Sequence, residues 1–300
     1  MKNPFPRARL NAGFVLMMIS AKGGVGKSTA TVNLAAALKA RGKKVGIFDA
    51  DLHGPNIPAL LGIRQKSDLT TSRHPAAMFP IQARPDSLDM RPLKPYERYG
   101  ISIMSLGLLV GDTQTINPQA DTVGMIITSL MGRVQWETDV LLVDMPPGTG
   151  EPLNTLLSSR LVDAALIIAV RERLAHLDNG RLVALLRTRK IPVLGVVENM
   201  THVVCPRCGE LIELYPSPVS GQAAYDGAAV LGSIPFHPHL IRPSQGGAPL
   251  PLSDIESPVR SPLLSLADSV LASMNELQSS NGSHRAEIDD LTDDDCIDCP

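Results

Sequence analysis

A glycine-rich segment that ends in a lysine and two hydroxyl residues is the strongest chemical signal in this sequence. Residues 21–29 read Ala-Lys-Gly-Gly-Val-Gly-Lys-Ser-Thr, between an apolar run and a helical pattern, which is the context of a phosphate-binding loop. Glycines let successive backbone N–H groups face one anion, and the N-terminus of the following helix adds positive potential. We expect Lys27 to lie on the β- and γ-phosphates of ATP and Ser28 to ligate Mg²⁺. The expected nucleotide-binding residues are Gly23, Gly24, Val25, Gly26, Lys27, Ser28 and Thr29.

Two apolar runs after this loop end in aspartates, at the edge where parallel sheets bind their ligands. The first run ends in Asp49-Ala50-Asp51, and the second, Leu-Leu-Val-Asp, ends at Asp144. We expect Asp144 to hold Mg²⁺ through water and a carboxylate of the first run to orient the attacking water. Met-Pro-Pro-Gly-Thr-Gly at 145–150 follows as a switch whose backbone can sense the γ-phosphate. One strand-ending aspartate often only caps a helix, but two of them after a phosphate loop indicate a nucleotide hydrolase.

The four cysteines form two Cys-x-x-Cys pairs, Cys205/Cys208 and Cys296/Cys299. In a chain without export signals this spacing favours metal or redox chemistry over structural disulfides. From the spacing alone, an iron–sulfur ligand pair, a zinc knuckle and a thioredoxin-like redox pair all remain open. His237 and His239 have no third ligand near them in the sequence, and we expect them to be solvated loop residues.

The elements that position these residues alternate between short apolar runs and helical patterns. This alternation predicts an α/β fold with a mostly parallel, twisted sheet flanked by helices on both faces. The expected strands are 14–20, 44–49, 101–106, 140–144, 164–170, 193–198 and 230–234. The expected helices are 27–41, 121–134, 174–189, 220–229 and 263–277. The last helix has an apolar stripe and no Lys or Arg on its polar face, so we expect it to pack on the core rather than on a membrane.

The ATPase domain is expected to span 14–278, with less regular segments around and within it. Residues 1–13 are an N-terminal extension, 64–98 a proline- and arginine-rich irregular insertion, and 200–216 a loop that carries the first Cys-x-x-Cys pair. From residue 279 the chain becomes polar and then acidic, which predicts a disordered tail up to residue 300.

The net charge and the N-terminal segment indicate which partners and which cellular location to expect. A formal net charge of -2 gives no electrostatic support for binding nucleic acid, which usually needs a clustered basic face. The apolar run at 14–19, preceded by three basic residues, imitates a secretory signal but is too short to cross a bilayer. It also leads directly into the phosphate loop, which cleavage would destroy. We therefore expect a cytoplasmic protein with no membrane or nucleic-acid partner.

The phosphate loop departs from the standard pattern, because Ala21 stands where the first glycine is usual and Lys22 follows it. In this respect it resembles the deviant Walker A loop of the MinD/ParA/Mrp group of P-loop NTPases. The resemblance implies a homodimer that encloses ATP, in which Lys22 crosses to the nucleotide of the other subunit and neutralises charge in the transition state. It also favours Asp51 as the residue that orients the attacking water.

Further segments resemble the Mrp/ApbC-type iron–sulfur cluster carriers, from about residue 14 to residue 250. They include 22–29, 49–55, 136–150, Glu198-Asn199-Met200, Cys-Pro-Arg-Cys-Gly at 205–209 and 231–235. The resemblance implies that Asn199 binds the adenine edge, and that Cys205 and Cys208 of two subunits hold one bridging [4Fe-4S] cluster. Such a carrier hydrolyses ATP slowly, receives its cluster from a donor and transfers it to apo iron–sulfur client proteins. A MinD/ParA-like positioning or partition ATPase and a zinc-stabilised nucleotide-binding adaptor are the alternatives.

Several positions around the nucleotide and switch regions depart from the carrier pattern. A Thr-Pro-Gln segment is replaced by Arg171-Glu172-Arg173, a Trp-Arg-Gly-Pro segment by 114–120, and an aspartate by His237. His53 and Asn56 also stand where the carrier pattern has other residue types. We expect the client, the turnover rate and the coupling to differ accordingly. The carrier pattern does not require Cys296 and Cys299, which are either incidental to a solubilising tail or an auxiliary metal or cluster-loading site.

Overall fold

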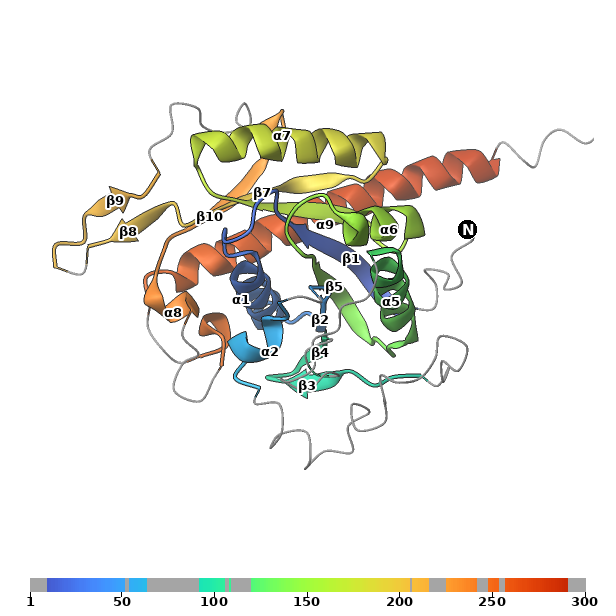
Figure 1. Ribbon diagram of the computed structural model, residues 1–300, viewed down its shortest axis with the longest axis horizontal. Helices are drawn as coiled ribbons and strands as arrows, with labels where there is room; N and C mark the ends of the chain where they lie inside the picture. The colour runs from blue at the N-terminus through green and yellow to red at the C-terminus, as the bar shows by residue number, and fades with distance from the viewer. Residues whose placement is uncertain are drawn as a thin grey trace, which may run out of the picture.

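An eight-stranded sheet with one antiparallel edge pair forms the centre of the protein (Figure 1). The computed structural model describes residues 10–51, 54–63, 92–105, 108, 120–205, 207–215, 225–241, 248–253 and 257–290. The strands lie in the order β10-β7-β6-β1-β5-β2-β4-β3, which places the strand before the phosphate loop near the middle. Their bounds are β1 (Ala12–Ile19), β2 (Val45–Asp49), β3 (Tyr96–Arg98), β4 (Ile101–Ser105), β5 (Thr138–Asp144), β6 (Ala164–Ala169), β7 (Val193–Asn199) and β10 (Val230–Ile234).

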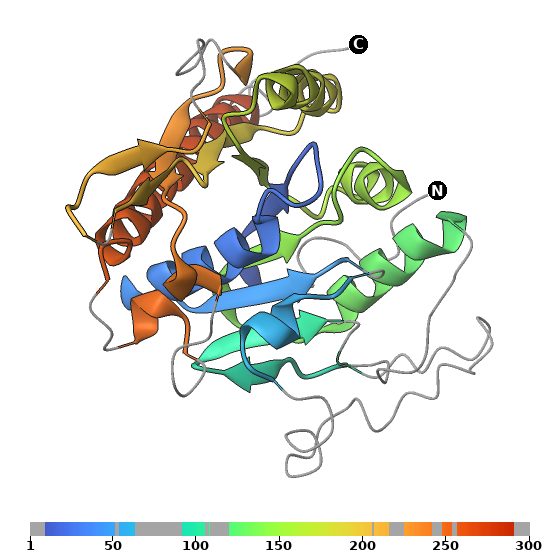
Figure 2. The same cartoon turned by 60° about the vertical axis from the view of Figure 1, so that its left-hand side comes forward.

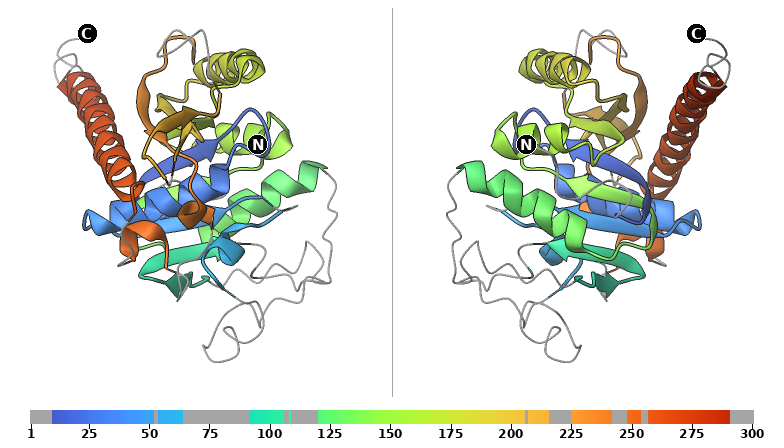
Figure 3. Two further views of the ribbon diagram at one scale, coloured as in Figure 1. Left: turned by 90° about the vertical axis from the view of Figure 1, so that its left-hand side faces the viewer. Right: turned by 90° about the vertical axis from the view of Figure 1, so that its right-hand side faces the viewer.

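Helices cover both faces of this sheet, and Figure 3 shows α5 and α9 on opposite sides of it. One layer contains α1 (Lys27–Ala40) and α9 (Arg260–Asp290), with the short α2 (Ile57–Leu60), α8 (Pro238–Ile241) and a 3₁₀ turn at Leu250–Leu252. The other layer contains α5 (Ala120–Arg133), α6 (Glu151–Ser159) and α7 (Arg173–Thr188). None of the helices in the described ranges is both long enough and apolar enough to cross a membrane.

Strand β1 shows why its sequence is apolar without interruption. Phe14, Leu16 and Met18 pack in the cluster formed with α1 and α9. The alternate residues of the same strand belong to the cluster formed with α5, α6 and α7. A strand buried on both faces needs apolar side chains at every position, as expected for a parallel sheet between two helical layers. The predicted α/β fold class is confirmed.

The strongly periodic segments were predicted well. All seven expected strands are present, and the expected helices 27–41, 121–134 and 174–189 correspond to α1, α5 and α7. The apolar stripe of α9 is buried against the core, as predicted, with Leu263, Leu266, Val270 and Met274 at most 5% exposed.

The predicted helix at 220–229 is wrong where the structure describes it. Residues 220–224 lie outside the described residues, and the rest of the segment is a turn that leads into β10. Asp226 and Gly227 have φ values of 51° and 81°, in the left-handed region that does not continue a right-handed helix. Tyr225, before this turn, has no exposed surface and is anchored in the core.

Three predicted segment boundaries also need correction. Strand β1 begins at Ala12, so the folded domain starts inside the predicted extension 1–13. Residues 96–98 of the predicted insertion form β3, which pairs antiparallel with β4 at the sheet edge; residues 64–91 lie outside the described residues. Helix α9 continues to Asp290 instead of ending near residue 278, because a helix that is nucleated on the core gains one hydrogen bond for each residue it adds. Cys296 and Cys299 lie outside the described residues.

Two elements near the functional segments were not predicted. Helix α6 follows the 145–150 switch directly, and it has Glu151 in its first turn and a proline near its start, both ordinary signals of a helix N-terminus. The predicted 200–216 loop contains a two-stranded antiparallel hairpin, β8 (His202–Val204) and β9 (Leu211–Glu213). We call residues 201–215 the cysteine arm. It extends away from the body of the protein (Figures 1 and 2).

The α5–α6 contact offers a test of the packing. A Cβ atom at Gly124 would lie 2.2 Å from Oγ1 and 2.5 Å from Cβ of Thr155, and rotation of Thr155 does not move its Cβ. We expect Gly124→Ala to lower the free energy of unfolding by about 1–3 kcal/mol, measured by urea denaturation. The control is Gly180→Ala in α7, where a Cβ would meet nothing within 4 Å; it should stabilise by up to about 1 kcal/mol. Equal stability of the two variants would refute this packing.

Candidate functional site

The phosphate loop turns sharply between β1 and α1, and glycine is required at its tightest point. Gly26 precedes α1 with φ 79° and ψ 26°, and a Cβ there would lie 2.4 Å from Nδ2 of Asn199. Both the backbone conformation and the available space therefore exclude a side chain. Helix α1 has no acidic residue in its first turn, so its N-terminal N–H groups retain the positive potential that favours an anion.

Asp144, at the end of β5, collects the polar side chains at the start of α1. Lys27 Nζ lies 2.7 Å from Oδ1 of Asp144, and Ser28 Oγ donates to Oδ2 at 2.6 Å. Thr31 Oγ1, one helical turn beyond Lys27, donates to Oδ1 at 2.8 Å. Asp144 has no exposed surface, so these donors replace the water it has lost. The structure brings the predicted residues Lys27, Ser28 and Asp144 together. Their expected roles toward ATP and Mg²⁺ remain predictions, and sequence reasoning did not select Thr31.

Asp49, at the end of β2, lies beside Asp144 because the two residues are partners in the parallel register of β2 and β5. Its carboxylate accepts hydrogen bonds from Ser105 Oγ at 2.9 Å, Asp51 N at 3.2 Å and Ile57 N at 3.4 Å. Burial, followed by the charge of Asp144, raises the pKa of Asp49 to about 7, although these three hydrogen bonds act in the opposite direction. Sequence reasoning considered Asp49 but preferred Asp51, and it did not select Ser105.

Asp51 has a different environment from Asp49. It is partly exposed, and its Oδ1 accepts a hydrogen bond from Gly54 N at 3.1 Å. Because it is more accessible than Asp49, a water molecule can approach it. Its expected role toward the attacking water remains a prediction.

Lys22 contacts acidic residues of its own chain. Its Nζ lies 3.6 Å from Oδ2 of Asp178 on α7 and 3.9 Å from Oε2 of Glu172, immediately before that helix. The three side chains are each 34–45% exposed, so these are weak, solvent-screened ion pairs. The expected reach of Lys22 to a second subunit remains a prediction.

Asn199 ends β7 and holds the phosphate loop from the side. Its Nδ2 donates to the carbonyl of Val25 at 2.8 Å, and Asn199 is itself 5% exposed. The bond restrains the loop just before Gly26, where a side chain would not fit. The adenine-binding role expected for Asn199 remains a prediction. The contact with Val25 occupies only the amide nitrogen of its side chain.

Another buried carboxylate lies next to Asn199. Glu198 is 4% exposed, and its Oε2 accepts a hydrogen bond from Arg171 Nε at 2.7 Å. Tyr225 donates to the other oxygen at 3.1 Å. Burial, and then the charge of Glu198, raises the pKa of Tyr225. Sequence reasoning noted Arg171 only as a departure from the carrier pattern; its partner was not evident because Glu198 lies in β7, 27 residues further along the chain.

Cys205 and Cys208 lie in a tight turn between β8 and β9. Gly209 N donates to the carbonyl of Cys205 at 2.9 Å, and Cys205 N donates to the carbonyl of Glu210 at 2.8 Å. The backbone N–H groups of Cys208 and Arg207 lower the pKa of the Cys205 thiol, which favours the thiolate that binds metals. Cys208 is exposed and Cys205 half-buried, and neither forms a disulfide. Within the described ranges, no group of three His, Cys, Asp or Glu residues is arranged to hold a metal ion.

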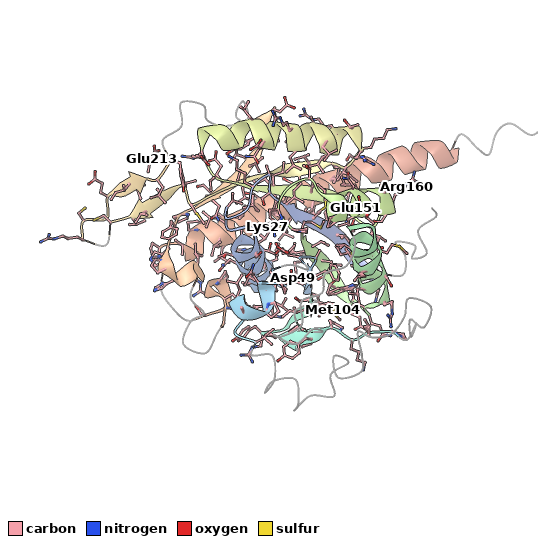
Figure 4. The ribbon with its side chains drawn as sticks, in the orientation of Figure 1. Lys27, Asp49, Met104, Glu151, Arg160 and Glu213 are labelled. Carbon is pink, nitrogen blue, oxygen red and sulfur yellow. The ribbon has the colours of Figure 1, made fainter. Side chains whose placement is uncertain are left out.

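The structure separates the predicted site residues into two places. The phosphate loop, Asp49, Asp51, Asp144 and Asn199 lie at the carboxyl ends of the central strands, whereas the cysteine pair lies on the arm. Figure 4 shows Lys27 and Asp49 near the centre and Glu213 out on the arm. The predicted nucleotide-binding residues and the thiol pair therefore lie at different positions on one chain.

A cavity of about 640 Å³ lies at the opposite edge, where β1 and β5 begin. Two of the acidic residues that line it already have backbone partners. Asp139 accepts a hydrogen bond from Lys44 N at 2.8 Å, and Asp163 accepts one from Val15 N at 2.7 Å. None of the predicted site residues lines this cavity.

Comparison with known proteins shows the family of this chain. Residues 11–271 match the ParA family model described as "NUBPL iron-transfer P-loop NTPase". An "Iron-sulfur cluster carrier protein" of Pyrococcus horikoshii is 33% identical over 272 residues, covering 90% of this chain and 89% of that protein. The predicted resemblance to the Mrp/ApbC-type carriers is thereby confirmed.

Solved structures share the fold. A nucleotide-binding protein of Archaeoglobus fulgidus in complex with ADP has a TM-score of 0.64 at 29% identity, covering 86% of this chain and 96% of that one. The cell division ATPase MinD of Pyrococcus furiosus has a TM-score of 0.60 at 22% identity, covering 87% and 99%. The second similarity concerns the fold alone.

The Lys27–Asp144 pair gives a testable consequence for stability. Lys27→Met should lower the free energy of unfolding by about 3–5 kcal/mol in the absence of nucleotide, because it leaves a buried carboxylate without its cation. Adding Asp144→Asn should restore much of the loss, and Lys22→Met, at an exposed pair, should change stability by no more than about 0.5 kcal/mol. Chemical denaturation of the four proteins measures this. A Lys27→Met protein as stable as wild type would contradict it.

The pKa of Asp49 predicts a pH dependence. An aspartate in an unfolded chain titrates near 4, so between about pH 4 and about pH 7 the folded protein keeps a proton that the unfolded chain has released. The stability of the wild type, relative to Asp49→Asn, should therefore fall as the pH rises through this range and level off above it. Denaturation midpoints of both proteins from pH 5 to pH 8, without nucleotide or Mg²⁺, test this. Parallel curves would show that Asp49 has an ordinary pKa.

Proposed function

This chain belongs to the NUBPL-type ParA family of P-loop NTPases, and from that membership we propose that it is an ATP-hydrolysing carrier of iron–sulfur clusters. It would receive a [4Fe-4S] cluster from a donor, hold it at a homodimer interface and transfer it to apo iron–sulfur client proteins. The cluster is cargo and ATP is the substrate. The observation that carries the proposal is the presence, on one chain, of a phosphate loop with its lysine and hydroxyl residues and of two free thiols in one tight turn.

The geometry of the cysteine turn supports a ligand role for Cys205 and Cys208. Two backbone N–H groups favour the Cys205 thiolate, and both thiols are free. A [4Fe-4S] cluster takes four cysteine ligands, whereas the turn supplies two. We propose that the arm of a second copy supplies the others. Leu211 and Ile212, beside the turn, are 62% and 52% exposed, and a second arm would cover this apolar surface.

The nucleotide site supports ATP binding and slow hydrolysis. The phosphate loop and Lys27 would hold the phosphates, and Lys27 would exchange its contact with Asp144 for them. Ser28 Oγ and the Asp144 carboxylate, 2.6 Å apart, are hard oxygen donors of the kind that Mg²⁺ prefers. These two residues would hold the ion, which offsets phosphate charge when bound. Asp51, at the accessible rim, would orient the attacking water.

Two further residues would complete the site. The Nδ2 atom of Asn199 already donates to Val25, so Oδ1 is the atom that would accept a hydrogen bond from the adenine amino group. Lys22 would leave its own acidic neighbours and reach the nucleotide of the second subunit. We also propose that the protein works in the cytoplasm, without a membrane or nucleic-acid partner.

Cysteine replacement tests the cargo and its ligands. We expect Cys205→Ser with Cys208→Ser to abolish the iron–sulfur chromophore after anaerobic reconstitution while ATP binding is retained. The matched control, Cys296→Ser with Cys299→Ser, should keep about two irons per chain, the content of one cluster shared by two chains. Iron and sulfide analysis, the visible spectrum and the mass in solution are measured for both variants.

The outcomes separate the alternatives. Wild-type iron content in the Cys205/Cys208 variant would show that the ligands are assigned wrongly. Stoichiometric zinc with no iron in anaerobically purified wild type would favour the nucleotide-binding adaptor. ATP-dependent binding to liposomes or DNA, with no metal, would favour a positioning or partition ATPase.

A further inference from the structure

Two adjacent residues between β6 and α7 lie near both the phosphate loop and the cysteine arm. Arg171 binds Glu198 and faces Glu213 on the cysteine arm, and Glu172 faces Lys22 in the phosphate loop. We propose that this Arg171-Glu172 junction couples the phosphate loop to the cysteine arm, so that ATP binding changes the conformation of the arm. The coupling concerns the chain itself; its use in cluster transfer rests on the function proposed above.

The arm side of the junction depends on the buried Glu198. Arg171 Nε and a terminal nitrogen each lie 2.7 Å from Oε2 of Glu198, which is nearly buried and therefore requires a cation. This contact fixes the guanidinium and leaves its other terminal nitrogen 3.9 Å from Oε1 of Glu213. Glu213 is partnered with His202 across the hairpin. Arg171 thus acts as a positioning residue at the base of the arm.

The loop side of the junction depends on weaker charges. Lys22 Nζ lies 3.9 Å from Glu172 and 3.6 Å from Asp178, all three in contact with solvent. Ion pairs of this kind are easily exchanged. The triphosphate of ATP carries more negative charge than these two carboxylates, so a bound nucleotide competes for Lys22.

A second set of contacts, through Asn199, also connects the phosphate loop to the Arg171-Glu172 junction. Asn199 follows Glu198 in β7 and donates to the carbonyl of Val25 in the loop. A movement of the loop on ATP binding therefore reaches Glu198 through Asn199, and reaches Glu172 through Lys22. Both paths meet at the junction, and from there Arg171 contacts the arm.

Coupling of this kind is reciprocal. If ATP favours one conformation of the arm, ligand binding to the arm changes the affinity for ATP by the same factor. The contact between Arg171 and Glu213 is the part of this coupling that mutation can test most cleanly. Glu213 is 60% exposed, and its replacement leaves the buried Arg171–Glu198 pair intact.

Thiol reactivity tests the inference without a cluster. Full-length protein with Cys296→Ser and Cys299→Ser leaves Cys205 and Cys208 as the thiols to react with iodoacetamide. We expect saturating ATP and Mg²⁺ to change their alkylation rate by about fivefold or more, the lower end of typical coupling. Glu213→Gln in this background should reduce the ATP effect to less than about twofold, while the affinity for ATP without alkylation stays that of the parent.

A matched control and a loop-side variant complete the experiment. Glu210→Gln changes an exposed acid on the same arm, for which the described contacts include no ion pair, and should keep the full ATP effect. Glu172→Gln should move the alkylation rate without ATP toward the ATP-bound value. An unchanged ATP effect in Glu213→Gln, or no ATP effect in the parent, would overturn the inference. Because reconstitution of the cluster is measured separately, such a result would leave the proposed carrier function standing.

Discussion

A carboxylate with no exposed surface at the end of a central strand is the constraint on which the nucleotide site depends. Asp144 is balanced by Lys27 at 2.7 Å and by hydroxyl groups of Ser28 and Thr31, so the first turn of α1 is tied to the end of β5. A buried charge without such partners would cost several kcal/mol. The phosphate loop must therefore turn within the short connection between β1 and α1, which explains why Gly26 cannot carry a side chain.

Glu198 is another buried carboxylate that requires a cation, and its partner links the region of the phosphate loop to the cysteine arm. Glu198 is buried beside the phosphate loop, and its cation, Arg171, comes from the neighbouring strand end. Because the carboxylate cannot be left unpaired, Arg171 is held where it also faces the cysteine arm. A solvent-exposed arm that carries thiols is thus based on a rigid, desolvated contact next to the nucleotide site. Such support beneath the turn that carries Cys205 and Cys208 suits the proposed carrier, which must both hold and release its cargo.

The parallel register explains why the acids gather, and it also shows where sequence reasoning stopped. Periodicity located the strands of the sheet, since a strand buried on both faces is apolar throughout. It could not distinguish Asp49 from Asp51, because both lie at the end of the same strand and only the pairing of β2 with β5 places Asp49 against Asp144. The turn at 225–229 resembled a helix in composition, but the burial of Tyr225 against Glu198 and two left-handed residues decided otherwise.

The sequence by itself determined the α/β class, the phosphate loop with Lys27, Ser28 and Asp144, and the cysteine pair as a metal-binding candidate. The loop, the strand-end aspartate and the cysteine pair are local features, since each depends on residue types within one loop or one strand end. The fold class follows from the alternation of apolar runs and helical patterns along the chain. Only the tertiary structure decided which charges neutralise one another: Lys27 with Asp144, Arg171 with Glu198, and Lys22 with Glu172 and Asp178. The physical reason is that the energy of a charge depends on its burial and on its nearest partners, and for most of these residues both come from segments far away in the chain.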